Sequence, residues 1–339
     1  MGNSDYKVEA FTGIRPTGGL TIANAIGGVN PIVKLQESGK IKSSMVFVAD
    51  LHALTDTEAK DSQKAVIDVV KDYISLGLDP KKNKIFIQSM LVEEVAELTI
   101  YLCRLVSVAE LLRVPTLKEK IKHGQSETSA NVLLAMYPIM MAADILLQRT
   151  EYVPVGEDQL AHMEMTRFLA QKFNKRYGDV FPIPKTLSLG EPIRVKSLNG
   201  SGKMSKTDPN GAILLDDPIE ISLSKIKKAQ TAFAGERSET LETLVLIGEF
   251  LSKEEERSNI SAIMQRHYAG ENVMGELKSF IGALLKKYLE EFQSKKKSLD
   301  EEEILKKIEE DSKIAKKNAQ DTLKEVRKTM GMEYITDSF

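Results

Sequence analysis

The first half of the chain alternates short runs of β-branched and aromatic residues with longer stretches of helical periodicity, and this alternation restricts the possible folds most strongly. The short runs have the composition of buried parallel strands and lie at 8–14, 45–49, 84–88 and 152–155. The helical stretches repeat apolar residues at spacings of three and four and lie at 64–77, 92–107, 131–147 and 158–176. Strands that alternate with helices form βαβ units, so the pattern predicts an α/β fold with a Rossmann-like, doubly wound parallel sheet.

The strand signal fades after about residue 206, and the rest of the chain has the pattern of helices. The polar breaks between these helices are expected near Gly235, Ser258 and Gly270. From Lys286 onward, blocks of Lys and Glu dominate and their charges nearly cancel. This pattern is typical of a solvated helix face with i,i+4 ion pairs. We therefore predict a sheet domain over 1–206 and an all-helical domain over 207–339, and leave open whether the last helix returns to the first domain.

Composition excludes several classes of protein. Cys103 is the only cysteine, so the chain forms no internal disulfide and no zinc or iron–sulfur site built on several thiolates, and a cytoplasmic location is expected. The 47 basic and 49 acidic side chains give a net charge of -2, so a polyanion must be bound locally. The most apolar run, 136–147, contains Asp144 and is shorter than the ~20 residues that a bilayer requires. No signal peptide and no membrane association are expected.

A candidate phosphate site follows the first predicted strand. The chain has neither G-x-x-x-x-G-K-[ST] nor G-x-G-x-x-G, but the strand ends in FTGIRPTGGLTIANAIGG, residues 11–28. Pro16 and the glycines turn the chain, and Thr21 or a neighbour begins a helix that contains Asn24. The free N–H groups and the dipole of a helix N-terminus attract anions. Ordinary βα turns have a similar sequence, so the binding and structural interpretations both stay open.

A second candidate site is the segment SLNGSGKMSKTDPNG, residues 197–211. Its glycines predict a mobile loop, and Lys203 and Lys206 stand three residues apart around Met204 and Ser205. Such a loop can close over a triphosphate and neutralise charge as it develops. The alternative is a solvated basic turn without a ligand.

Several motifs together resemble one family. TIAN at 21–24 and KMSKT at 203–207 are similar to the paired signatures of class I aminoacyl-tRNA synthetases. The remaining motifs closely resemble the bacterial type of tryptophanyl-tRNA synthetase; they are GIRPTG at 13–18, ADLHALT at 49–55, MYPIMMAADILL at 136–147 and VPVGEDQLAHMEMTRFLAQKFNKRYG at 153–178. The match is colinear from about residue 11 to 215. It implies ATP-dependent ligation of L-tryptophan to tRNA(Trp) through a tryptophanyl-adenylate, with release of pyrophosphate and AMP.

The resemblance implies a set of tryptophan-binding residues. Asp144 lies in an apolar segment that predicts a buried helix, and a buried carboxylate needs a donor. In the family that donor is the indole N–H; a structural carboxylate satisfied by the backbone or by Arg149 is the alternative. The other implied contacts are Met141, Val153 and Val155 as pocket walls, Phe11 beside the indole or packed inward, His52 near the same crevice, and Tyr137 with Gln159 at the amino-acid head group. His162 is expected in packing or on the helix surface.

The resemblance likewise implies ATP-binding residues. Thr21 and Asn24 would hold phosphate and ribose oxygens, while the lysines of the KMSKT loop, Lys203 and Lys206, and Mg²⁺ would spread the charge of the departing pyrophosphate. The tryptophan carboxylate attacks the α-phosphorus, so no enzyme nucleophile is needed, and the nucleotide carries the metal without a protein carboxylate cage. The other implied ATP contacts are Arg15, Thr17, Gly18, Ala23, Lys120, Gly156, Asp158 (ribose, or a plain N-cap), Met204 and Ser205.

Some positions depart from the family pattern. Ala23 stands where the family has glycine, Arg15 where many members have glutamine, and Thr207 replaces the last serine of KMSKS. An added methyl at Ala23 is expected to crowd the adenine. Two other functions stay open, namely a tyrosyl-tRNA synthetase and a degenerate paralogue that binds tryptophan or RNA without catalysis.

The family also implies partners. A homodimer is expected, and the helical region from about 207 to 300 is the candidate for anticodon contact. Lys225, Lys227 and Lys228 are candidate phosphate partners there, although lysines on helices are often only solubilising.

Overall fold

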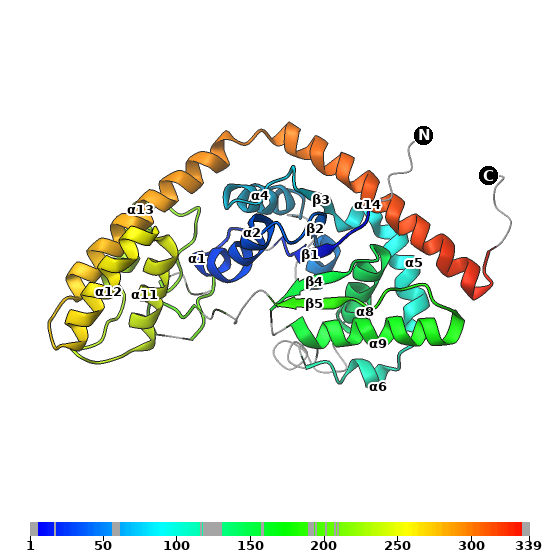
Figure 1. The fold of residues 1–339 in the computed structure, drawn as a ribbon, viewed down its shortest axis with the longest axis horizontal. Coiled ribbons are helices and arrows are strands. Elements are labelled where there is room, and N and C mark those ends of the chain that lie inside the picture. Colours follow the sequence, from blue (N-terminus) through cyan, green and yellow to red (C-terminus); the bar gives the residue numbers. More distant parts are fainter. Residues whose placement is uncertain are drawn as a thin grey trace.

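A computed structural model describes most of the chain. The described residues are 6–16, 18–55, 62–115, 117, 131–156, 159–188, 193, 195–200, 202–206, 208 and 210–333. Figure 1 shows a sheet domain and a helical bundle joined by two long helices that run over the top of the molecule.

Five parallel strands form the sheet in the order β3-β2-β1-β4-β5. They are β1 (Ala10–Ile14), β2 (Ser44–Val48), β3 (Asn83–Ile87), β4 (Tyr152–Val155) and β5 (Lys185–Ser188). The four predicted strands and the doubly wound parallel sheet are confirmed, whereas β5 was missed. Because β1 lies between β2 and β4, the direction of winding reverses there. Open α/β sheets bind ligands at such a reversal, beyond the carboxyl ends of the strands.

Side chains alternate between the two faces of each strand and build two cores. On one face, Val46 and Val48 join the core formed with the helices that follow β1 and with α4. On the other, Phe11 and Phe47 stack with ring centroids 4.8 Å apart in a core shared with α5, α8 and α9. The helices and helical turns of the sheet domain are α1 (Ile22–Asn24), η1 (Ala25–Val29), α2 (Asn30–Glu37), α3 (Asp50–Ala53), α4 (Ser62–Ser75), η3 (Gln88–Leu91), α5 (Val92–Cys103), α6 (Val108–Leu111), α8 (Val132–Leu147) and α9 (Leu160–Tyr177).

The C-terminal part of the chain is helical, as predicted. Its helices are α10 (Ile219–Lys228), α11 (Glu239–Leu251), α12 (Glu254–Tyr268), α13 (Met274–Ser298) and α14 (Glu301–Met330). The breaks predicted near Gly235 and Gly270 are confirmed, and both glycines have the positive φ that favours glycine. The break predicted near Ser258 is wrong, because this residue lies inside α12 and its hydroxyl donates to the Glu255 carbonyl. The chain turns earlier, at Ser252, where α11 ends.

The last helix, α14, lies against the sheet domain. Its apolar stripe, which includes Ala315 and Leu323, packs into the same core as Phe11. The buried Asp311 accepts the backbone N–H of Ile85 in the edge strand β3 at 2.9 Å. The outer face carries the expected i,i+4 pairs, such as Lys313–Glu309 at 2.7 Å. The helix is therefore only half solvated, and a domain boundary near residue 206 stays a prediction.

A polar network joins α13 to the sheet domain. The ammonium of Lys296 lies 2.5 Å from Asp72 of α4 and 2.8 Å from Asp216. Asp216 follows residues 197–211, the segment with Lys203 and Lys206 that we call the lysine loop. Gln293 donates to two backbone carbonyls of the segment around Asp216, each at 2.9 Å. Burial raises the pKa of the Asp72 carboxyl to about 6. The network links the helical bundle, the loop segment and the sheet domain at one point.

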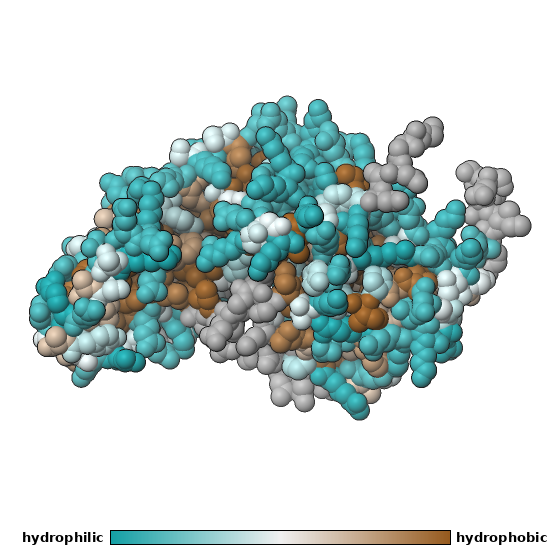
Figure 2. Space-filling view, viewed as in Figure 1, coloured by the Kyte–Doolittle hydropathy of each residue, from teal (hydrophilic) through white to brown (hydrophobic). Residues whose placement is uncertain are grey.

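The visible surface in Figure 2 is mostly hydrophilic and has separate hydrophobic patches. Among the described residues, no helix combines the length and apolarity that crossing a membrane requires.

Candidate active site

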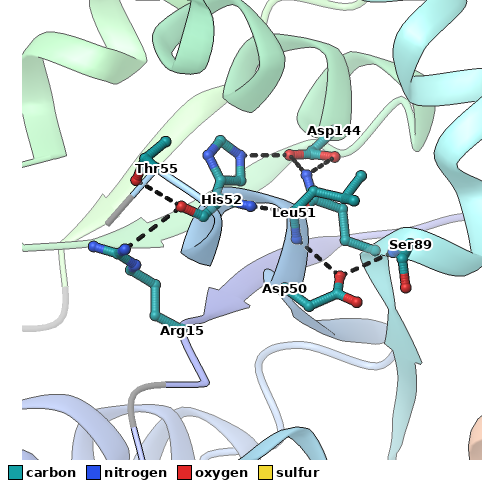
Figure 3. A network of polar contacts seen from close by, with 8 residues as sticks. Arg15, Asp50, Leu51, His52, Thr55, Ser89 and Asp144 are labelled. Carbon is teal, nitrogen blue, oxygen red and sulfur yellow. Dashed lines mark hydrogen bonds and ion pairs between the residues drawn. The ribbon is translucent and has the colours of Figure 1, made fainter. Parts of the chain in front are cut away.

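Polar residues follow the carboxyl ends of four strands. After β2 the chain turns into α3, which carries His52, and after β3 it turns into η3, which begins with Gln88. The signature helix α1 follows β1, and Gln159 follows β4. Asp144 reaches the same edge from α8. Figure 3 shows His52 and Asp144 facing each other, with Arg15 on the other side of His52.

Asp144 is the centre of this cluster and is only 5% exposed. The ring Nε2 of His52 lies 3.0 Å from Asp144 Oδ2. Because a carboxylate only accepts, Nε2 carries the hydrogen. Gln88 Nε2 donates to the same oxygen at 2.8 Å and to Oδ1 at 3.0 Å. Burial raises the pKa of Asp144, while its bonds with His52 and Gln88 oppose that rise. Arg149, the structural partner considered from the sequence, pairs instead with Glu325 of α14.

Two further members of this cluster, Gln88 and Asp50, were not predicted from the sequence. Asp50 Oδ1 accepts the backbone N–H groups of Leu51 and Ser89, each at 3.0 Å, and so ties α3 to η3 (Figure 3). Gln88 is fully buried and lies at the end of the third predicted strand. A polar residue at the carboxyl end of a buried strand is the signal that would have found it.

Two side chains donate hydrogen bonds to the backbone carbonyl of His52. Arg15 Nη2 donates to the His52 carbonyl at 3.5 Å, and the Thr55 hydroxyl donates to it at 2.8 Å (Figure 3). Arg15, an implied ATP contact, therefore lies beside the polar cluster at the end of β1.

The candidate indole-pocket residues share one apolar cluster. Phe11 is 1% exposed and packs inward on Phe47, which agrees with the packing alternative. Tyr137 is buried, and its ring meets that of His52 edge to face at 6.4 Å. Its hydroxyl lies 3.3 Å from Nε2 of His162, a buried packing residue. The remaining members of the predicted pocket belong to the same cluster and are Met141, Val153 and Val155.

The signature helix begins as the sequence predicts, with Thr21 as the N-cap of α1. Asn24 Oδ1 accepts the Thr21 N–H at 2.9 Å and its hydroxyl hydrogen at 2.8 Å, while the Thr21 hydroxyl accepts the Asn24 N–H at 3.2 Å. The two candidate ligand contacts thus form a capping box. Thr21 is buried and Asn24 is exposed, so Asn24 is the more accessible of the two. Ala23 between them is partly buried against the core.

In the lysine loop, Lys203 forms an antiparallel bridge with Lys196. Lys203 and Ser205 are exposed, whereas Met204 is buried in the core. The ammonium of Lys206 donates to the Gly18 carbonyl of the turn before the signature helix. Burial lowers the pKa of Lys206.

Backbone bonds reinforce this contact between the two signatures. Ile22 donates to the Ile213 carbonyl and Leu215 donates to the Leu20 carbonyl, both at 2.9 Å. Two segments nearly two hundred residues apart in sequence therefore lie side by side.

The other predicted contacts have different outcomes. Gly156 is exposed, and its carbonyl accepts the Gln159 N–H at 3.0 Å. Thr17, Lys120, Asp158 and Thr207 lie outside the described residues. Among the described part of the chain, no group of three or more His, Cys, Asp or Glu residues could hold a metal ion.

Lys225, a candidate partner for an RNA phosphate, has partners within the chain. Its ammonium points inward, 2.8 Å from the Ala212 carbonyl and 2.8 Å from Asp217. Lys227 and Lys228 are exposed, and their role stays a prediction.

Known proteins are similar to this chain in sequence and in fold. A family model described as tRNA synthetases class I (W and Y) matches residues 3–331. The tryptophan–tRNA ligase of Clostridium acetobutylicum is 40% identical over 243 residues, which are 68% of this chain and 69% of that protein. The tryptophan–tRNA ligase of Clostridium longisporum is 33% identical over 98% of this chain and 99% of its own.

Solved structures agree in fold. The tryptophanyl-tRNA synthetase of Campylobacter jejuni, complexed with ADP and tryptophan, is 27% identical, has a TM-score of 0.81 and covers 96% of this chain and 100% of its own. The Mycoplasma pneumoniae enzyme is 28% identical with the same TM-score and covers 96% of this chain and 98% of its own. Since the family model spans nearly the whole sequence and a relative matches it from end to end, the chain belongs to the class I tRNA synthetases of the tryptophan and tyrosine group.

Proposed function

We propose that the protein ligates L-tryptophan to tRNA(Trp) in two steps, through a tryptophanyl-adenylate. One observation carries the choice of amino acid: the buried Asp144 carboxylate, bound to His52 and Gln88, lies at the carboxyl edge of the sheet. A ring with a single N–H donor suits such an acceptor. The curated relatives share the name tryptophan–tRNA ligase, which supports the same substrate.

In the first step the tryptophan carboxylate attacks the α-phosphorus of ATP, and pyrophosphate leaves. Asp144 accepts the indole N–H, Tyr137 and Gln159 orient the head group, and Met141, Val153 and Val155 enclose the ring. Lys203 and Lys206 neutralise the negative charge that develops on the leaving phosphates, and Asn24 at the N-terminus of the signature helix supports the nucleotide. Positioning and charge stabilisation thus replace covalent catalysis.

The position of Lys206 suits this role. Its contact with the Gly18 carbonyl holds the ammonium beside the turn at the helix N-terminus, where a triphosphate is expected. An arriving phosphate offers this ammonium a charged acceptor in place of a neutral carbonyl, and charge-assisted hydrogen bonds are the stronger ones.

In the second step a ribose hydroxyl at the tRNA terminus attacks the adenylate, which releases AMP. We propose that ATP enters with Mg²⁺, that the reaction takes place in the cytoplasm, and that the helical bundle contacts the anticodon. A homodimer is part of the same proposal and follows from the family resemblance.

Exchange of labelled pyrophosphate into ATP tests the proposal, because it requires only the first step. Exchange should depend on tryptophan and be absent with tyrosine. Exchange with tyrosine alone would assign the protein to the other amino acid of the family, and no exchange with either would support a degenerate paralogue.

A further inference from the structure

Gln88 uses both ends of its amide inside the active-site cluster. Its Nε2 donates to both oxygens of Asp144, at 2.8 and 3.0 Å, and its Oε1 accepts the backbone N–H of His52 at 3.3 Å. The residue is fully buried at the start of η3. One amide therefore links η3, α3 and α8, and turning it over would break contacts at both ends.

The contacts distinguish the two oxygens of Asp144. Oδ2 receives His52 Nε2 at 3.0 Å and Gln88 Nε2 at 2.8 Å, whereas the one contact to Oδ1 among the described residues is the longer bond from Gln88. A carboxylate oxygen has two lone-pair directions, so Oδ2 is saturated by protein donors and Oδ1 retains one acceptor direction. A substrate N–H is therefore best received by Oδ1.

The terminal torsion of an aspartate is a soft, roughly twofold rotor, so a single donor holds the orientation of the carboxylate weakly. We infer that Gln88 is a positioning residue for amino-acid recognition, because its amide fixes the Asp144 carboxylate with Oδ1 toward the N–H of the substrate ring. This inference rests on the proposed function, in which Asp144 accepts the indole N–H. Without the amide, His52 alone would hold the carboxylate, and neither oxygen would be reserved for the substrate.

A substrate analogue separates this role from simple packing. In β-(1-benzothien-3-yl)-L-alanine a sulfur atom replaces the indole N–H in a ring of similar shape. The ratio of the affinities for tryptophan and the analogue measures the hydrogen bond to Asp144, while general loosening of the pocket weakens both ligands. Calorimetric titration of the wild type should give a preference for tryptophan of roughly 10- to 100-fold, the usual range for a hydrogen bond to a charged group.

In Gln88→Met, which keeps the length of the side chain and removes both polar ends, this preference should fall by roughly tenfold and the affinity for ATP should not change. Gln148→Met is the matched control. Gln148 is also a buried glutamine that follows α8, but it donates to the Ala315 carbonyl of α14 at 3.0 Å. Its substitution should leave the preference at the wild-type value.

Gln88→Glu provides a second readout in case the methionine variant does not fold. The introduced carboxyl faces Asp144, so the two groups repel each other when both are ionised and share a proton at lower pH. Tryptophan binding by this variant should be weak near neutral pH and recover as the pH falls, because the shared proton restores a donor to Asp144. The wild type should show no such recovery.

The outcomes separate the inference from the proposed function. An unchanged preference in Gln88→Met, or an equal fall in Gln148→Met, would overturn the role of Gln88 and leave tryptophan as the substrate. A wild type that binds tryptophan and the analogue equally would overturn Asp144 as the acceptor as well. A wild type that binds no tryptophan would overturn both proposals.

Discussion

The buried carboxyl of Asp72 makes the stability of this protein depend on pH in a defined direction. The group is 1% exposed, and burial outweighs the ion pair with Lys296, so the folded state has a pKa of about 6 where the ordinary value is 3.8. Between these two values the folded state holds a proton that the unfolded state has lost. The free energy of unfolding should therefore fall as the pH rises through this window.

The size of the effect follows from the same values. A rise in pKa from 3.8 to about 6 corresponds to about 3 kcal/mol, at about 1.4 kcal/mol for each pKa unit. Asp72→Asn removes this titration and keeps the shape of the side chain. The stability of the wild type relative to Asp72→Asn should decrease by up to about 3 kcal/mol from the lower to the upper end of the window.

Urea unfolding followed by circular dichroism at several pH values across the window measures this difference. Asp216→Asn is the matched control, because Asp216 binds the same lysine but its side chain is 43% exposed. Asp216→Asn should change the pH dependence of the free energy of unfolding little. The reasoning would be refuted if the free energies of unfolding of the wild type and Asp72→Asn changed in parallel with pH. It would also be refuted if the wild type became more stable relative to the variant as the pH rises.

Three further predictions concern other parts of the molecule. Lys203→Ala and Lys206→Ala should each slow tryptophan activation roughly 100-fold with little change in tryptophan affinity. The reason is that the ammonium groups act on charge that forms in the transition state. Stopped-flow measurement of the activation rate, together with a titration of tryptophan binding, checks this. Ala23→Gly should tighten ATP binding by about 1 kcal/mol in calorimetry if the methyl crowds adenine, and unchanged ATP binding would mean that the backbone has adjusted. Asp311→Ala should lower the free energy of unfolding in urea by about 2 kcal/mol, because it leaves the N–H of Ile85 in β3 without an acceptor. Asp311→Asn keeps an acceptor and should lower it less.

Hydrophobic patterns predicted those elements of the fold whose burial shows in their own short stretch of sequence. The four strands of branched and aromatic residues and the long periodic helices were predicted because burial dictates their composition. β5 has the sequence KTLS, which is short and polar, and lies at the edge of the sheet, so its composition carries no strand signal. Ser258 resembles a break in sequence but is tolerated inside α12, because its hydroxyl bonds to the preceding turn.

The candidate site was predictable where one residue conflicts with its surroundings. Asp144 stands out as a charge in an apolar helix. Gln88 carries a weaker signal, a polar residue at the end of a buried strand, and its partner lies 56 residues away. The internal partners of Lys225 were not predicted, because the sequence does not reveal which way a side chain on a helix turns. The start of the signature helix was predictable because its capping box joins Thr21 and Asn24, which lie only three residues apart in the sequence.

The position of α14 on the edge strand has a consequence for how the chain is made. Asp311 follows its partner in β3 by 226 residues, so a ribosome finishes the whole sheet long before the acceptor for that strand emerges. Until then the nascent sheet exposes an unpaired edge, which is a template for association with other chains. A fragment that ends near residue 206 would retain this exposed edge permanently. We expect such fragments to aggregate, and we expect the edge of the native sheet to be covered only late in synthesis, when the last helix packs against β3.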